Sequence, residues 1–423
     1  MQYQTPTGMT RRHFAKHLMG LSAFAGTSMA LGRSLSAHVN ELAKNKKSAI
    51  LLWMGGGPST IDLWDLKPGT ENGGPFQPIA TTGDMQICEH LPLMAQQMDK
   101  MSIVRNMSTR EADHQRGRYY MHTGYVPNPN IEHPSYGSVI SHELIGSRAA
   151  ELDLPPFVSI GGGSEGPGFL GMSWAPFTVD SRGNVNNLQM NLPPDRLTQR
   201  MQALRLLETG FIDENRGQSA VEHAKVLQKT LNLMSSNQMS AFRSEAESSD
   251  VRSRYGENNF GRSCLMARRL VQAGVPFVEV NFGGWDNHQG IFPTLENQRL
   301  PMLDQGMSAL VEDLVQRGMW EDTAVIWMGE FGRTPRINGN AGRDHWARSW
   351  SVVVGGAGMK GGQAIGETDK DGLQIISDKS YTSEDLMASI CKSMGISLET
   401  SFTSNSGRPM KIANSGKLID ELF

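Results

Sequence analysis

The chain has 423 residues, of which 38% are hydrophobic and 20% are charged, as expected for a soluble globular protein with one large domain or two ordinary ones. Its formal net charge of −3 shows no large excess of either sign, which argues against nucleic acid or an anionic membrane surface as the main partner. The three cysteines, Cys88, Cys264 and Cys391, form no CxxC pair and are odd in number, so neither a zinc-thiolate site nor a disulfide framework is expected.

An export signal is predicted over residues 1–37. The motif TRRHFAK (10–16) precedes a mild apolar stretch, residues 18–31, that is too short and too rich in Gly, Ser and Ala to span a bilayer. This pattern is typical of a twin-arginine signal, and SMA (28–30) and SLS (34–36) both suit cleavage. We therefore expect export by the twin-arginine translocase, a periplasmic or extracellular location and no membrane span in the mature protein. The alternative is an ordinary basic amphipathic N-terminus.

One domain is predicted after the signal, over residues 45–423. The apolar run SAILLWM (48–54) followed by GGGP is typical of a buried strand that ends in a loop, and 101–105 forms a shorter strand. Residues 151–215 are rich in Gly, Pro and Asn, and we interpret them as irregular connections in a cap-like region over the site. Residues 218–249 have a largely polar helical pattern.

Helices and strands alternate in the second half of the chain, and the strands are apolar throughout. This alternation predicts an α/β fold with a mostly parallel central sheet that is covered on both faces. The expected elements are a helix over 264–273 that ends at Gly274, strand 275–280, a helix over 303–317 that ends at Gly318, strands 323–328 and 351–354, and a helix over 383–394.

Acidic residues and histidines follow four of the predicted strands. In open α/β sheets, sites form beyond the carboxyl ends of the strands, so these side chains are expected at one edge. Asp, Glu and His suit zinc, manganese and other hard divalent ions. Any one of these residues is more often a cap or turn residue, but the agreement of four strands favours a metal site. The residues are Asp62 and Asp65, Asp113 and His114, Asp286 and His288, and Glu330.

A further histidine, His345, lies in the stretch GRDHW (342–346), before a predicted strand rather than after one. It reaches the same edge only if strand 351–354 runs antiparallel to the others or if the loop folds back. The alternative is a loop histidine stacked between Trp346 and Trp350.

Together these stretches resemble a secreted bacterial family, domain of unknown function 1501, which belongs with the alkaline phosphatase and sulfatase superfamily. The matching motifs extend over nearly the whole chain after the signal, and GEFGRTP with GRDHW is a highly specific combination. The motifs are GGGPSTIDLWDLKPG (55–69), HLPLMAQQMDKMSIVRNMS (90–108), DHQRGRYYMHTG (113–124), YGENNFGRSCLMARRL (255–270), GGWDNH (283–288), GEFGRTP (329–335) and GRDHW (342–346).

The resemblance implies a three-layer α/β/α fold and a site at the strand ends with one or two divalent ions, such as zinc, calcium or manganese. Asp62 or Asp65 resembles the early acidic ligand of that superfamily. Asp286 and His288 resemble its paired Asp and His. Glu330 takes the place of a later Asp-His pair, and His345 resembles the final His ligand.

The sulfatase nucleophile has no counterpart in this chain. Sulfatases carry C/S-x-P-S-R-x-x-x-x-T-G, whose first residue becomes formylglycine. Alignment on Thr123 and Gly124 matches Arg118 to the motif arginine and puts His114 at the nucleophile position, so formylglycine cannot form. We interpret His114 as a metal ligand or a base, with loss of chemistry as the remaining option. Arg118 suits an oxyanion, and Arg333 either does the same or holds Glu330 in place.

The expected function is metal-dependent hydrolysis of phosphate or sulfate esters, through water activated by the metal rather than through formylglycine. The expected partner is a small anionic ester or a sulfated or phosphorylated glycan. The main alternative is a non-catalytic exported protein of the same fold that binds metal or glycan, and a weaker one is an assembly partner in the cell envelope.

Overall fold

The computed structural model describes residues 47–185 and 236–423, together with scattered positions between 196 and 234. The predicted export signal, residues 1–37, lies outside the described residues. Among the helices that are described, none is both long and apolar enough to cross a membrane.

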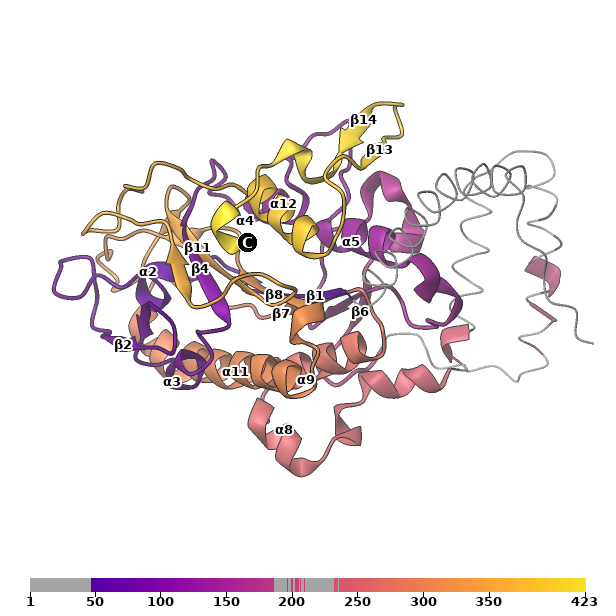
Figure 1. Ribbon diagram of the computed structural model, residues 1–423, viewed down its shortest axis with the longest axis horizontal. Coiled ribbons are helices and arrows are strands. Elements are labelled where there is room, and N and C mark those ends of the chain that lie inside the picture. Colours follow the sequence, from indigo (N-terminus) through magenta and orange to yellow (C-terminus); the bar gives the residue numbers. More distant parts are fainter. Residues whose placement is uncertain are drawn as a thin grey trace, which may run out of the picture. The chain divides into compact units, whose positions relative to one another are not determined.

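The domain is built around an eight-stranded sheet (Figure 1). From one edge to the other, the strand order is β12-β4-β11-β8-β1-β7-β5-β6. The strands are β1 (Ser48–Trp53), β4 (Met101–Met107), β5 (Phe157–Ile160), β6 (Phe177–Val179), β7 (Phe277–Asn281), β8 (Thr323–Met328), β11 (Trp350–Gly355) and β12 (Gln363–Ile365).

Strand β11 runs against the direction of the rest. It is antiparallel to β4 and β8, whereas every other pairing in the sheet is parallel. All residues of β1, β8 and β11 are buried, which explains why these segments have continuous apolar runs rather than alternating patterns. The prediction of a mostly parallel sheet is confirmed.

Helices cover both faces of the sheet. In Figure 1, α9 (Asn259–Gln272) and α11 (Leu300–Gln316) lie below it, and α4 (His114–Thr123), α5 (Tyr136–Leu144) and α12 (Ser383–Ser393) lie above it. Successive side chains of a strand point to opposite faces, so Leu52 packs in the core below and Leu51 in the core above. The predicted three-layer α/β/α fold is confirmed.

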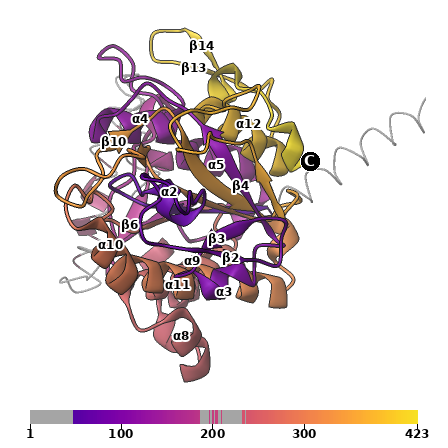
Figure 2. The same cartoon turned by 90° about the vertical axis from the view of Figure 1, so that its left-hand side faces the viewer.

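Shorter elements surround this core, and Figure 2 looks onto the side that carries α2, α10 and β10. The short helices are α2 (Thr60–Leu63), α3 (Pro92–Ala95), α8 (Ser249–Tyr255) and α10 (Ile291–Thr294). The short strands are β2 (Pro78–Ala80), β3 (Gln86–Cys88), β9 (Gly332–Arg333), β10 (His345–Trp346), β13 (Ser401–Thr403) and β14 (Pro409–Lys411).

Two sequence-based expectations need correction. Residues 151–215 are not irregular throughout, because β5 and β6 join the main sheet; these strands are too short to stand out in a Gly- and Pro-rich segment. The helix predicted over 218–249 lies largely outside the described residues. Its described end forms two 3₁₀ turns, Asn237–Phe242 and Ser244–Ala246. Ser236 and Arg243, which precede these turns, have extended backbone and so interrupt a continuous helix.

Candidate metal centre

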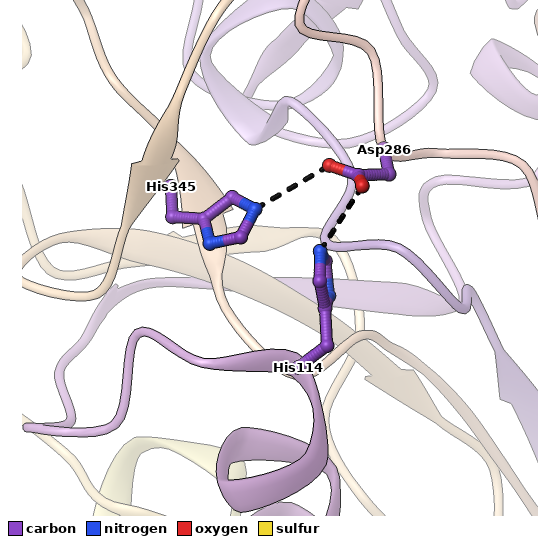
Figure 3. Close-up of side chains that lie close together, drawn as sticks. All are labelled: His114, Asp286 and His345. Atoms are coloured by element: carbon purple, nitrogen blue, oxygen red, sulfur yellow. Dashed lines mark hydrogen bonds and ion pairs between the residues drawn. The ribbon is translucent and has the colours of Figure 1, made fainter.

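Side chains from four separate strand ends meet at one place. Asp286 follows β7, Glu330 follows β8, and His114 is the first residue of α4, after β4. His345 precedes β11, and because β11 is antiparallel, its beginning lies at the edge where the parallel strands end. His114, Asp286 and His345 therefore converge although 231 residues separate the first from the last (345 − 114) in the chain (Figure 3).

Three imidazoles present the same nitrogen to Asp286. The Nε2 of His114 lies 3.3 Å from Oδ2 of Asp286. The Nε2 atoms of His288 and His345 lie 2.9 Å and 3.4 Å from Oδ1. One ligand atom from each of His114, Asp286 and His345 lies within 4.8 Å of the others. Two histidine nitrogens and a carboxylate oxygen at this spacing form a donor set that suits zinc or manganese.

The Nδ1 atoms of His114 and His345 are hydrogen-bonded to acceptors outside the cluster. Nδ1 of His114 lies 2.6 Å from Oε1 of Glu330, and Nδ1 of His345 lies 2.8 Å from the carbonyl oxygen of Ala112. Carbonyl and carboxylate oxygens only accept, so Nδ1 is the donor in both rings. In the neutral imidazole, Nε2 then carries the lone pair that faces Asp286, as metal-bound histidines require.

His288 is held in the same way. Its Nδ1 donates to Oδ1 of Asp344 at 2.7 Å, and its Nε2 lies 3.2 Å from Nε2 of His345. Asp344 was missed in the sequence, although it stands next to His345 in GRDHW. Nη1 of the Arg333 guanidinium lies 3.3 Å from Nε2 of His288, so a cation of the chain itself lies beside this pair of nitrogens.

Glu330 holds the site together as an acceptor. Its Oε1 accepts from the Gly56 amide at 2.9 Å as well as from His114. This hydrogen bond raises the pKa of His114, and burial opposes it without cancelling it. The other oxygen, Oε2, and Nε2 of His114 are buried atoms without a hydrogen-bond partner among the described residues. Unsatisfied buried polar atoms that face a ligand cluster are consistent with an ion there.

Arg333 fixes Asp286 and has no donor left over. Its Nη2 donates to Oδ1 of Asp286 at 2.5 Å and to the Gly56 carbonyl, and its Nε donates to the Gly57 carbonyl at 2.7 Å. Its Nη1 lies 3.2 Å from the Arg343 carbonyl and 3.3 Å from Nε2 of His288. A guanidinium has five N–H groups, and all five are engaged.

These contacts leave Arg333 with neither of the two roles proposed for it from the sequence, binding an oxyanion or holding Glu330. It cannot donate directly to an oxyanion and it does not bond to Glu330; it positions Asp286 and contributes a fixed charge. Burial alone would raise the pKa of Asp286, but the hydrogen bond and the charge of Arg333 outweigh burial and lower it to about 2. Asp286 is therefore ionised, as a metal ligand must be.

Phe331 forms an apolar floor beneath the cluster. Its ring lies 5.1 Å from the His114 ring and 4.8 Å from the His345 ring, measured between centroids, and it is fully buried. An apolar wall strengthens electrostatic interactions at the site because it excludes water.

Gly56 allows the first loop to approach Asp286. Its φ is +114°, and a Cβ there would lie 2.5 Å from the amide nitrogen of Asp286. Both the backbone conformation and the lack of space therefore require glycine at this position of the GGGP stretch after β1.

Asp62 and Asp65, the expected early acidic ligands, are not brought into the cluster. Arg343 contacts both oxygens of Asp62 at 2.7 and 2.8 Å, and both residues are fully buried. Asp65 accepts from Thr368 and pairs with Lys67 at 3.0 Å. The carboxylates of Asp62 and Asp65 are thus occupied by donors of the chain itself.

Arg118 lies one helical turn after His114 on α4, and so on the same face of the helix. Its Nε lies 3.0 Å from Oε1 of Glu165, and its Nη2 donates to the Gly163 carbonyl. Three of its five N–H groups have no partner among the described residues, so it keeps donors for an anion.

Comparison with known proteins identifies the family of this chain. Residues 46–423 match the family described as "Protein of unknown function (DUF1501)". No curated protein matches the chain.

Solved structures with some likeness share little sequence. The PsFucS1 sulfatase from Pseudoalteromonas sp. is 11% identical, with 85% of this chain and 71% of that chain covered and a TM-score of 0.40. The phosphonate monoester hydrolase of Agrobacterium radiobacter is 10% identical, with 89% of this chain and 77% of that chain covered and a TM-score of 0.36.

Proposed function

The chain belongs to the DUF1501 family, and from the geometry of its strand-end cluster we propose that it is a metal-dependent hydrolase of phosphate or sulfate esters. In this proposal His114, Asp286 and His345 hold a divalent ion. Zinc and manganese fit this mixture of nitrogen and carboxylate donors.

The observation that carries the proposal is the common orientation of the histidines. Each Nε2 faces Asp286 while each Nδ1 is held by a separate acceptor: Glu330, the Ala112 carbonyl or Asp344. Folding alone does not require three rings to share this arrangement, and Nε2 of His114 is a buried polar atom without a hydrogen-bond partner among the described residues, which is costly. Such outer acceptors are the usual means of orienting histidine ligands.

A bound divalent ion would supply Lewis acidity and lower the pKa of water at the site. The chain itself supplies the groups that bind and orient an anionic ester. Arg118 has N–H donors without a partner among the described residues on the His114 face of α4, whereas the first turn of that helix is already capped by the carboxylate of Asp113. Arg333 keeps Asp286 ionised and in place.

Water is the proposed nucleophile. His114 occupies the place of the sulfatase nucleophile, and its Nδ1 is bound to Glu330, so it is assigned to the metal rather than to attack on the ester. The Asp344–His288 pair is a carboxylate-oriented imidazole, the usual form of a general base. We assign to it the transfer of a proton from water and its delivery to the leaving alcohol, which requires Nε2 of His288 to give up its long, 3.3 Å contact with Nη1 of Arg333.

The experiment that tests this function is a turnover screen with aryl phosphate and aryl sulfate esters. Wild type should hydrolyse at least one of them, chelation should abolish turnover, and a divalent ion should restore it. Asp286→Ala and His345→Ala should each lose turnover, whereas Asp378→Ala, an exposed aspartate, should keep it. Full turnover in both site variants would refute the assignment.

The runner-up is a non-catalytic metal- or glycan-binding protein. It is favoured by one observation, the engagement of all five N–H groups of Arg333, which leaves one fewer oxyanion donor than the sequence suggests. Bound metal without turnover of any sulfate or phosphate ester would support it.

We also propose export through the twin-arginine route, on the pattern TRRHFAK (10–16). A double Arg11→Lys, Arg12→Lys variant should remain inside the cell, and its normal appearance in the periplasmic fraction would contradict this proposal.

A further inference from the structure

A pocket lies at the same edge of the sheet as the metal cluster. It has a volume of about 480 Å³ and is lined by residues that follow three neighbouring strands: Gly161 after β5, Asp180 after β6 and Gly283 after β7. The first turn of α9, with Asn259 and Phe260, forms another wall. Figure 2 shows β6, α9 and α10 on this side of the domain.

Arg299 is the cation of this pocket, and its guanidinium has no hydrogen-bond or ion-pair partner among the described residues. Its Nε is buried without a partner, and its guanidinium carbon lies 5.5 Å from the centre of the Phe282 ring. Burial lowers the pKa of Arg299, and no carboxylate opposes that shift. Arg333 and Arg343, two other arginines of this edge, differ from Arg299 because each uses all five of its N–H donors.

The backbone around Arg299 is adapted to this placement. Residues Leu295–Arg299 form a π-helical turn between α10 and α11. Such turns are rare, they insert one residue into a helix, and they occur often at functional sites. On the other side, Gly284 has a φ of +90°, and a Cβ there would collide with the guanidinium. Both segments thus make room for an arginine without a protein partner.

The pocket's one carboxylate does not neutralise Arg299. Oδ1 of Asp180 accepts from the Arg182 and Asn184 amides at 2.8 Å each, and Oδ2 accepts from the Asn184 side chain at 2.8 Å. Both oxygens of Asp180 are therefore engaged within their own turn, and neither pairs with Arg299. The N-terminus of α9 adds partial positive charge to the wall beside Arg299.

The distance to the metal cluster is short. Arg299 packs against Gly284, which is two residues before Asp286. Two residues span at most about 7 Å of chain. The backbone that Arg299 contacts is therefore within about 7 Å, along the chain, of the backbone of Asp286.

We propose that this pocket is a second anion subsite, which binds a tetrahedral oxyanion of the substrate next to the ester under attack. The inference rests on the proposed function and narrows its substrate to an ester with at least two anionic groups. A glycan sulfated or phosphorylated on neighbouring sugars has this chemistry. Phe260 and Phe282, stacked with ring centroids 4.5 Å apart, supply an apolar surface beside the charge.

Arg299→Gln tests the subsite through selectivity. The ratio of kcat/KM for a disulfated disaccharide to that for its monosulfated counterpart should fall about tenfold or more, because a charged hydrogen-bond donor is lost. Arg299→Lys should retain part of the selectivity, since it keeps the charge. The control, Arg408→Gln on the exposed β13–β14 hairpin, should leave the ratio unchanged. Bisphosphorylated and monophosphorylated disaccharides, measured in parallel, identify which oxyanion is preferred.

Calorimetric binding separates failure of the subsite from failure of the proposed function. If no ester is hydrolysed but Arg299→Gln weakens binding of the disulfated or bisphosphorylated disaccharide about tenfold, the subsite stands and the catalytic proposal falls. If esters are hydrolysed and Arg299→Gln changes neither selectivity nor affinity, the subsite is overturned and the catalytic proposal stands.

Discussion

The three imidazoles around Asp286 differ in what holds them. His114 and His345 belong to the compact ligand group, whereas His288 is oriented by Asp344 at the side of the cluster. An exposed carboxylate partner suits a proton carrier better than a ligand, because it can stabilise the imidazolium that forms.

This difference leads to a prediction that separates ligand from base. His288→Ala should lose most turnover, by about 10²-fold or more, and still bind metal. His345→Ala should lose both turnover and metal. Metal content measured on both purified variants, with the α5 variant His142→Ala as a control, decides between the roles. Equal loss of metal in the two site variants would make His288 a fourth ligand.

At the level of single residues, the sequence predicted which side chains gather but not how their donors are shared. His114, Asp286 and Glu330 meet because residues after parallel strands lie at one edge of the sheet, and His345 joins them because it precedes the antiparallel strand β11. The sequence could not show that Asp62 lies outside this cluster, because Asp62 is held by a bidentate bond to Arg343, which is 281 residues away in the chain. Burial of an arginine leaves no local pattern in a sequence.

At the level of elements, the loop after β1 depends on backbone conformation. Gly56 faces the amide of Asp286, has a φ of +114° and donates to Glu330, so the loop links two of the strand ends. A side chain here would strain the backbone and push the Asp286 segment away.

Gly56→Ala should therefore lower the free energy of unfolding by at least about 2 kcal/mol and reduce metal binding. Gly69→Ala is the matched control: its φ is +76°, but no atom lies within 4 Å of the added Cβ. The control should cost about 1 kcal/mol and leave metal binding intact. Urea denaturation and metal titration give both quantities, and equal effects of the two substitutions would disprove the role of close approach.

Elements with strong end signals were easier to predict than those without. The helix expected over 264–273 ends correctly near Gly274, but α9 begins five residues earlier, at Asn259, because Asn258 caps it and accepts from the Gly261 amide. Strands β5 and β6 have only short apolar segments, and pairing with β7 rather than local pattern makes them strands.

At the level of the whole molecule, a buried ion pair links the upper helix layer to the sheet. His122 of α4 lies 3.4 Å from Glu279 of β7, and both are almost completely buried. Burial lowers the pKa of His122, but the Glu279 carboxylate, with help from the Arg118 carbonyl, outweighs it and raises the pKa above its ordinary value. The folded state therefore binds this proton more tightly than the unfolded state does.

The sign of the pH dependence follows. The His122–Glu279 pair stabilises the folded state fully below the pKa of His122 in the unfolded chain, about 6.5. This stabilisation is lost as the pH rises through the higher pKa of His122 in the folded state. The stability difference between wild type and His122→Gln should thus be larger at about pH 5.5 than at about pH 9. Urea unfolding at both values measures it. A difference that grows with pH would show that His122 is buried neutral.

The layered α/β/α architecture could be predicted from alternating helix and strand patterns, since apolar strands need cover on both faces. The order of the eight strands could not, because strand order depends on crossovers that leave no periodic signal. The reversal of β11 was open in the sequence as one of two ways for His345 to reach the site, and the structure adopts it.

The central claim, that His114, Asp286 and His345 hold one divalent ion, is tested most directly by anomalous diffraction from crystals grown with zinc or manganese. We predict a peak about 2.0–2.2 Å from Nε2 of both histidines and from an oxygen of Asp286. A metal-saturated crystal with no peak there, or with its peak elsewhere on the chain, would contradict the account.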